Sequence, residues 1–202
     1  MTRQFHDHAL SGDALAQLFT EARSYNGWID RPVSEAQLEA IYDLMKMAPT
    51  SANMQPIRIV WAKSAEARQK LADCVMAGNK AKVLAAPVTA ILAYDIDFHE
   101  QLPWLFPHTD AKSWFAGDEA GRIEGAFRNS SLQGAYLMLA ARALGLDCGP
   151  MSGFDAEAVH AAFLADEPRH RVNFICSIGY GDPASIFERS PRPEFARFNR
   201  VV

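Results

Sequence analysis

Ala48-Pro49-Thr50-Ser51-Ala52-Asn53-Met54-Gln55-Pro56 is the stretch that decides the fold, because a helical pattern ends where it begins and a strand pattern follows directly. Upstream, Ser34-Glu35-Ala36-Gln37 is a capping-box sequence that predicts the start of a helix, and Pro49 is expected to stop that helix. Downstream, Ile57 to Ala62 is rich in β-branched residues and predicts a buried strand. The stretch itself is therefore predicted to be a polar loop that leads into a sheet.

The rest of the chain adds more helices than strands. Val88 to Tyr94 and Val172 to Ile178 predict two further buried strands, and the longest helix is predicted from about Asp118 to Leu144, with Gly145 as its C-terminal cap. These elements predict a mixed fold, in which many helices surround a small sheet.

Helical periodicity groups apolar side chains on one face of three predicted helices. The groups are Leu15, Leu18 and Phe19 between Leu10 and Arg23; Leu38, Ile41, Tyr42 and Met45; and Leu132, Tyr136, Leu139 and Ala143. The small residues Gly125, Ser130, Gly134 and Ala141 lie elsewhere on the longest helix. They would allow another helix to approach closely, either within the chain or across a dimer interface.

Composition restricts the class of protein. The 202 residues are 49% hydrophobic and 22% charged, and no linker divides them, so we expect one globular domain over residues 1–202. A formal net charge of −4 gives no basic field that would attract nucleic acid or a membrane surface. The three cysteines are far apart and suggest neither disulfides nor a zinc site, and no apolar run is long enough to cross a bilayer. We therefore expect a cytoplasmic protein.

Residues 96–118 have neither a helical nor a strand period. Five aromatic residues are interleaved there with prolines and histidines: Phe98, Trp104, Phe106, Trp114 and Phe115, with Pro103, Pro107, His99 and His108. A long irregular segment inside a compact domain is often a binding loop, so we predict a lid. The alternative is a satellite hydrophobic cluster packed on the core.

The usual signatures of hydrolytic, metal-dependent and nucleotide-binding enzymes are absent from the sequence. His6-x-His8 could chelate a metal, but a fortuitous pair near a terminus is the better interpretation, so we expect no metal site. No acid, base or nucleophile is singled out. This favours chemistry that is carried by a cofactor.

Five polar segments lie at the ends of predicted elements and together offer the donors that a phosphorylated, planar cofactor needs. They are Arg23-Ser24-Tyr25-Asn26-Gly27-Trp28, Pro49 to Pro56, Gly78-Asn79-Lys80-Ala81-Lys82, Gly149-Pro150-Met151-Ser152-Gly153-Phe154-Asp155, and Arg189-Ser190-Pro191-Arg192. Each segment taken alone is also explained as an ordinary polar turn.

In order and content, these segments resemble the flavin-dependent nitroreductase family from Leu15 to the Arg192 region. The loop at residues 48–56 resembles the family's Ala-Pro-Ser-Ser-x-Asn-x-Gln-Pro, and Asn79 with Lys82 matches its Asn-x-x-Lys. Several strings are most similar to the malonic semialdehyde reductases of pyrimidine degradation. They are Asn26-Gly27-Trp28, Leu105-Phe106-Pro107-His108, Ala126-Phe127-Arg128-Asn129-Ser130-Ser131 and Gly149 to Asp155.

The resemblance implies an α+β fold with a central, mainly antiparallel sheet, and an intertwined homodimer with FMN at its interface. It places Arg23, Ser24, Arg189 and Arg192 at the FMN phosphate, and Asn79 and Lys82 at the pyrimidine edge of the ring. Pro49, Thr50, Ser51, Asn53 and Gln55 would come from the other subunit, and Pro150, Met151, Ser152 and Gly153 would lie beside the reactive edge. Asn26 would also contact FMN, at a position where many relatives have a cation.

The implied chemistry is ping-pong: NADPH or NADH reduces flavin N5 by hydride transfer and is replaced by a small-molecule electron acceptor. Lys82 would stabilise negative charge on the reduced ring, and no side chain need be a catalytic acid or base. Substrate residues are predicted to be Trp104, Phe106 and Trp114 in the lid, with His108, Lys112 or Arg128 for a carboxylate. Alternatives are a broad nitroarene or quinone reductase, and a flavin-binding or scaffold dimer without turnover.

Overall fold

The computed structural model describes residues 8–202, so His6 of the His6-x-His8 pair lies outside the described residues. The described part contains one sheet in the order β1-β2-β4-β3, and all three pairings are antiparallel. The strands are β1 (Ile57–Ala62), β2 (Val88–Asp95), β3 (Asp147–Met151) and β4 (His170–Gly179). The predicted α+β fold with a mainly antiparallel sheet is confirmed.

Helices surround this sheet, as predicted. They are α1 (Gly12–Leu15), α2 (Glu35–Met45), α3 (Ala65–Ala72), α4 (Ala77–Ala85), α5 (Leu102–Leu105), α6 (Ser113–Ala116), α7 (Glu119–Ala143), α8 (Ala156–Phe163) and α9 (Phe195–Phe198). Residues 8–202 also contain four short helical segments: the π-helical η1 (Ala16–Thr20) and the 3-10 turns η2 (Ser51–Asn53), η3 (Phe98–Gln101) and η4 (Pro183–Ser185).

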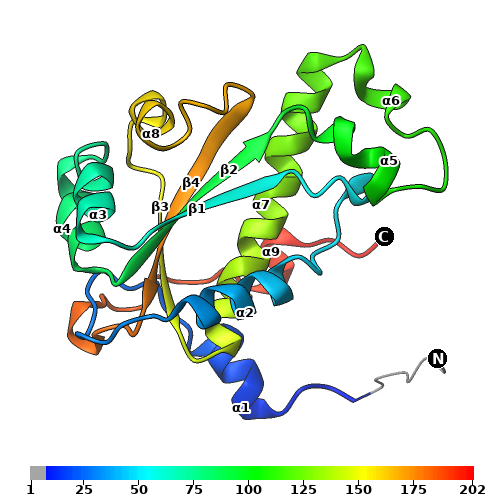
Figure 1. Cartoon of the computed structure of the whole chain (residues 1–202). Helices are drawn as coiled ribbons and strands as arrows, with labels where there is room; N and C mark the ends of the chain where they lie inside the picture. Colours follow the sequence, from blue (N-terminus) through cyan, green and yellow to red (C-terminus); the bar gives the residue numbers. More distant parts are fainter. Residues whose placement is uncertain (1–7) are drawn as a thin grey trace.

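The two faces of the sheet are covered by different helices, because successive side chains of a strand point to opposite faces. Val88, Ala90 and Leu92 of β2 pack in one cluster with residues of α2 and α7, whereas Ile91 packs with residues of α3, α4 and α8. Figure 1 shows the sheet between these two groups of helices, with α5 and α6 beyond one end of it. A third cluster joins the segment at residues 96–118 to this core.

The long helix begins and ends as the sequence predicts. The Asp118 side chain caps the first turn of α7 by accepting from the amide of Gly121 at 2.9 Å. At the other end Gly145 has a φ of 76°, the left-handed conformation that glycine adopts without steric cost. The capping box of α2 at Ser34 and Gln37 is also present, although α2 ends at Met45, before Pro49.

One strand, β3, was not predicted from the sequence. Gly149 and Pro150 interrupt its pattern, and proline cannot donate a hydrogen bond to a ladder. β3 tolerates Pro150 because it lies at the end of the strand order, where β4 is the one described strand that pairs with it. The predicted loop at residues 149–155 is therefore partly an edge strand.

The apolar faces predicted on the helices are only partly buried. Leu38, Ile41 and Met45 are buried as predicted, but Tyr42 is 49% exposed, which corrects its inward assignment. Leu15, Phe19, Leu132 and Tyr136 are also exposed within the single chain. On α7, Gly134 lies against the sheet, because a side chain there would collide with Phe174 of β4. Ala141 packs in one cluster with residues of α2, so both the sheet and another helix of the same chain lie against α7.

Candidate functional site

The segment that starts at Arg23 lies against the free edge of the sheet. Ser24 forms a parallel bridge with Cys148 of β3, and the amide of Tyr25 donates to the Cys148 carbonyl at 3.0 Å. Gly149 allows this approach, because a Cβ there would lie 2.5 Å from the Tyr25 carbonyl oxygen. Arg23 and Ser24 are thereby fixed next to residues 149–153.

The segment after β4, at residues 185–189, lies against residues 20–26. Arg23 donates to the carbonyl of Phe187, and Asn26 donates to the carbonyl of Ser185 at 3.2 Å. Arg189 donates to the carbonyls of Thr20 and Ala22, at 2.9 and 3.0 Å. The structure therefore brings Arg189 to the Arg23 segment, while Arg192 donates only to the nearby carbonyls of Ser190 and Pro191.

Asn79 and Lys82 complete this group of residues, which we call the edge cluster: Arg23, Ser24, Asn26, Asn79, Lys82, residues 150–153 and Arg189. Both residues lie on α4, a helix that the sequence analysis did not predict, and their spacing of three residues puts them on one face. Asn79 donates to the Gly153 carbonyl at 3.0 Å, and a Cβ at Gly153 would lie 2.7 Å from the Asn79 amide nitrogen. Within residues 8–202, the cations Arg23, Lys82 and Arg189 have no carboxylate partner.

The loop between α2 and β1 has an unusual backbone. Ala52, Asn53 and Gln55 have φ values of 48°, 48° and 40°, although none of them is glycine. L-residues rarely adopt this left-handed region, and such strain persists only where surrounding contacts fix it. We call residues 50–55 the strained loop.

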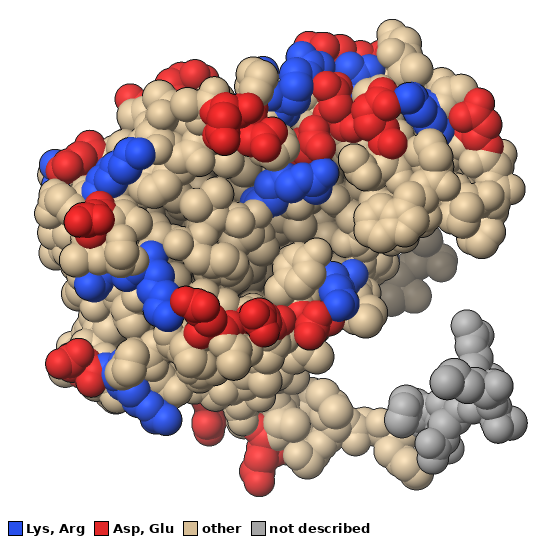
Figure 2. Space-filling model, viewed as in Figure 1, with Lys and Arg blue, Asp and Glu red and all other residues tan. Residues whose placement is uncertain are grey.

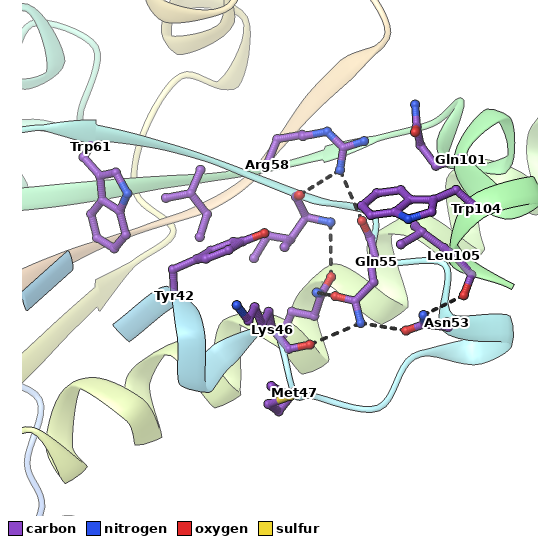
Figure 3. A pocket seen from close by; sticks show the side chains of 13 residues that line it. Tyr42, Lys46, Met47, Asn53, Gln55, Arg58, Trp61, Gln101, Trp104 and Leu105 are labelled. Atoms are coloured by element: carbon purple, nitrogen blue, oxygen red, sulfur yellow. Dashed lines mark hydrogen bonds between the residues drawn. The ribbon is translucent and has the colours of Figure 1, made fainter. Parts of the chain in front are cut away.

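The amide side chains of the strained loop are engaged with the protein itself (Figure 3). Asn53 donates to the Leu105 carbonyl at 2.8 Å, and Gln55 donates to the Asn53 side-chain oxygen at 2.9 Å. Met54 between them is 2% exposed and belongs to the third hydrophobic cluster. The side chain of Gln55, which the sequence analysis assigned to a cofactor site, is thus bonded within the protein and holds the loop together.

A groove of about 680 Å³ lies beside the strained loop. In Figure 3 the side chains of Tyr42 and Trp61 lie at one end of it, and Trp104 and Gln101 lie at the other. Asn53 and Gln55 line it together with Trp104 and Leu105, so the loop and the predicted lid share one surface.

The predicted lid combines the two alternatives that the sequence left open, an exposed aromatic loop and a hydrophobic cluster packed on the core. Phe98 and Leu102 are buried in the third cluster, whereas Trp104 and Trp114 are 77% and 57% exposed. The segment is also less irregular than predicted, because η3, α5 and α6 lie within it. Phe106 packs edge-on against Trp114, with ring centroids 6.2 Å apart, and against His108 at 5.3 Å.

Both ends of the lid segment are attached to α7 by the guanidinium of Arg122, which is 6% exposed. Arg122 donates to the Ile96 carbonyl at 3.0 Å and to the Phe115 carbonyl at 2.9 Å. Asp97 accepts two hydrogen bonds from Arg169, and Glu119 accepts one, at 2.8 Å. These hydrogen bonds from Arg169 lower the pKa of both carboxyl groups.

Two of the three residues predicted to meet a substrate carboxylate already have acidic partners. Lys112 pairs with Glu100, and Arg128 pairs with Glu124 one turn away on α7. Both are surface pairs, which contribute little to stability and exchange readily. His108, the third candidate, is exposed at the lid.

Sequence reasoning missed three residues that organise this region: Asn129 and Gln133, which contact the strained loop, and Arg122 below the lid. They are buried polar side chains on α7. They could have been recognised in the sequence, because a charged residue and two amide residues lie on a face of the long helix whose other residues are mostly small.

The strained loop and the segment before the edge cluster contact α7 at different points. The loop contacts it at Asn129 and Gln133, whereas the segment before Arg23 contacts it at Arg142, whose carbonyl accepts from Gln17 and whose guanidinium donates to the Leu18 carbonyl. At 1.5 Å per residue these points are about 14 to 20 Å apart along the helix.

Among the described residues, none of the helices is long and apolar enough to span a membrane, and no three metal-binding side chains gather. On the face shown in Figure 2, acidic and basic side chains alternate, with no large area of one sign.

Comparisons with known proteins find extensive similarity. The model of the Nitroreductase family matches residues 1–180. A protein of Polynucleobacter asymbioticus, named as a candidate NADH dehydrogenase/NAD(P)H nitroreductase, is 57% identical over 193 residues, which are 96% of this chain and 98% of that protein. A protein of the same name from Stenotrophomonas maltophilia is 55% identical over 195 residues, covering 96% and 99%.

Solved structures share the fold. A candidate nitroreductase from Exiguobacterium sibiricum, solved in complex with FMN, has a TM-score of 0.83 and 21% identity over 93% of this chain and 97% of that one. A candidate nitroreductase from Bacillus subtilis has a TM-score of 0.82 and 23% identity, with coverage of 94% and 99%.

Proposed function

The chain belongs to the nitroreductase family, and on this premise we propose that it is an NAD(P)H-dependent oxidoreductase that binds FMN. The observation that carries the proposal is the edge cluster. It contains Arg23 and Arg189, whose segments are bonded to each other, and Lys82, which lies one turn from Asn79 on α4. None of these cations is neutralised by a carboxylate within the described residues.

The donors of the edge cluster suit the two ends of FMN. Arg23, Ser24 and Arg189 would hold the phosphate, because guanidinium and hydroxyl groups bind phosphate oxygens by charge-assisted hydrogen bonds. Lys82, with Asn79 one turn away, would stabilise negative charge on the ring. The bound flavin would supply the hydride chemistry, and the backbone at residues 151–153 would hold its reactive edge.

We further propose that the working unit is a homodimer, in which the strained loop of one subunit completes the edge cluster of the other. Two observations support it. Within one chain, the contacts of the loop on α7 are about 14 to 20 Å along the helix from the contact of the segment that precedes the edge cluster. Apolar side chains of the predicted helix faces, among them Leu132 and Tyr136 on α7, are exposed, and exposed apolar surface commonly marks an interface.

For the acceptor we propose malonic semialdehyde, reduced to 3-hydroxypropionate. Hydride from NAD(P)H would add to the aldehyde carbon by way of the flavin, and a proton from solvent would complete the alcohol. Support comes from the resemblance of Leu105 to His108 and Ala126 to Ser131 to the reductases of that substrate. Trp104 and Trp114 would exclude water above the ring, and His108 would face the carboxylate.

A second candidate is a broad nitroarene or quinone reductase. One observation favours it: Lys112 and Arg128 are already paired with Glu100 and Glu124, which reduces the positive charge offered to an acidic substrate. Flat acceptors need few polar contacts, because they stack on the ring.

The test is the visible absorption spectrum of the purified protein, before and after adding FMN and then NADPH or NADH under nitrogen. We expect flavin bands near one FMN per chain that bleach on reduction. A protein that takes up no FMN would overturn the assignment, and bound FMN that neither nucleotide reduces would indicate a flavin-binding protein without turnover.

Acceptors then separate the two reductases. Malonic semialdehyde, a quinone and a nitroarene are each added to the reduced protein, and reoxidation of the flavin is followed. A kcat/KM that is highest for the semialdehyde supports the first proposal. A preference for the flat acceptors supports the second.

A further inference from the structure

Two buried amide side chains of α7 form hydrogen bonds with the strained loop. We propose that Asn129 and Gln133 are positioning residues, which fix the strained loop, with its left-handed residues Ala52, Asn53 and Gln55, in the form that contacts FMN in the partner subunit. This inference rests on the proposed function. The two residues lie one turn apart, so both point to the same side of the helix.

Gln133 is fully buried and begins a chain of amide hydrogen bonds. Its side-chain oxygen accepts from the amide of Ile57 at 3.1 Å, and its nitrogen donates to the Gln55 side-chain oxygen at 2.6 Å. Gln55 then donates to Asn53, and Asn53 donates to the Leu105 carbonyl. Each side-chain amide donates to the next. This series of hydrogen bonds links the start of β1 to the lid through the strained loop.

Asn129 holds the other end of the loop. It is 5% exposed, and its side-chain oxygen accepts from the amide of Ser51 at 2.9 Å, while its nitrogen donates to the Gly125 carbonyl of its own helix. The remaining hydrogen bonds of the loop backbone span at most five residues. Asn53 and Met54 donate to the carbonyls of Thr50 and Ser51, the Gln55 amide donates to the Thr50 hydroxyl, and the Gln55 carbonyl accepts from Arg58. Local bonds of this kind form an ordinary turn and do not select three left-handed residues.

The anchors therefore determine where the polar atoms of the loop point. Thr50 and Ser51 precede the left-handed residues directly, and their orientation depends on the Ser51 amide that Asn129 holds. Without Asn129 or Gln133 the strained backbone is expected to relax to a common conformation, which turns these groups away from the partner's flavin.

The test compares Asn129→Ala and Gln133→Leu with Ser130→Ala as the matched control. Ser130 is also buried on α7 and accepts a hydrogen bond from Asn173 of β4, but it does not contact the loop. Asn129→Asp is the conservative variant: a carboxylate oxygen still accepts from the Ser51 amide, and the variant loses only the hydrogen bond to the Gly125 carbonyl within α7.

Two readouts are measured on each protein: hydrogen exchange of the peptide covering residues 50–57 before FMN is added, and the dissociation constant of FMN from quenching of its fluorescence. We expect faster exchange and about 10-fold weaker FMN binding for Asn129→Ala and Gln133→Leu, as for the loss of one buried hydrogen bond. Ser130→Ala and Asn129→Asp are expected to remain within about 3-fold of the wild type on the same scale.

Unchanged exchange and unchanged FMN binding in Asn129→Ala and Gln133→Leu would overturn the proposal. So would equal losses in Ser130→Ala, because they would show a general weakening of α7. A wild-type protein that fails to bind FMN would instead refute the proposed function, and hydrogen exchange alone would then decide whether the two residues hold the loop.

Discussion

At Gly134 the approach of α7 to the sheet leaves no room for a methyl group. A Cβ there would lie 2.6 Å from the ring of Phe174 and 3.1 Å from Leu92. By contrast, a Cβ at Gly125, two and a half turns earlier on the same helix, would meet only the end of Met54 at 3.9 Å. The sequence does not distinguish the two glycines. They differ in which side chains lie next to them in the folded protein.

We therefore expect Gly134→Ala to lower the free energy of unfolding by about 1–3 kcal/mol, the usual cost of overpacking a core. Gly125→Ala is the control and should raise it by up to about 1 kcal/mol, because alanine favours a helix. Urea denaturation of both variants measures the difference. Equal stability of the two would show that Phe174 moves aside at no cost.

At the scale of elements, the lid segment is joined to α7 and to the start of β4 by charged groups. Arg169, just before β4, bonds both Asp97 at the start of the lid and Glu119 at the start of α7, and Arg122 lies within 3.6 Å of the same two carboxyl groups. The lid is thus held at its base, while Trp104 and Trp114 remain exposed.

This arrangement predicts a pH dependence. Because Arg169 lowers the pKa of Asp97 and Glu119 in the folded state, the unfolded chain takes up protons first as the pH falls. The stabilisation should be complete above about pH 5 and should be lost as the pH falls through the lowered pKa values of the folded protein.

Thermal unfolding between pH 7 and pH 3 measures this effect. Arg169→Gln should lower the melting temperature at pH 7 and flatten its fall below about pH 4.5. Arg171→Gln is the matched control, because Arg171 donates to backbone carbonyls only. If the melting temperature of Arg169→Gln falls with decreasing pH as steeply as that of the wild type, the prediction is contradicted.

At the scale of the whole molecule, the chain leaves apolar side chains of α7 uncovered. Leu132 is 48% and Tyr136 is 40% exposed, and Phe19 before the edge cluster is 53% exposed. The periodicity predicted that Leu132 and Tyr136 share one face of the long helix, and both side chains are exposed in the single chain. A homodimer would cover this face and would bring a second strained loop to the edge cluster.

We expect the protein to sediment as a dimer with twice the 22.3 kDa mass of one chain. Charges in the uncovered face, as in Leu132→Glu with Tyr136→Glu, should produce monomers that also bind FMN more weakly. Leu84→Glu, at an exposed apolar position on α4, is the control and should remain dimeric. Monomeric wild-type protein, or a dimeric double variant, would refute the proposed interface.

The sequence by itself determined the elements whose signals are local. Ser34 and Gln37 cap α2, Asp118 and Gly145 bound α7, and the β-branched runs of β1, β2 and β4 form strands, because capping and strand preference depend on neighbouring residues. The polar segments of the candidate site were also found in this way, since hydroxyl, amide and guanidinium groups are visible in composition.

The tertiary structure alone decided the contacts between distant segments. β3 is a strand because β4 pairs with it despite Pro150, and the face of α7 that becomes buried is chosen by Phe174 and Leu92. The left-handed backbone at Ala52 depends on anchors at Asn129 and Gln133, more than seventy residues away. Such features balance local strain against long-range hydrogen bonds and packing, so no local pattern in the sequence can reveal them.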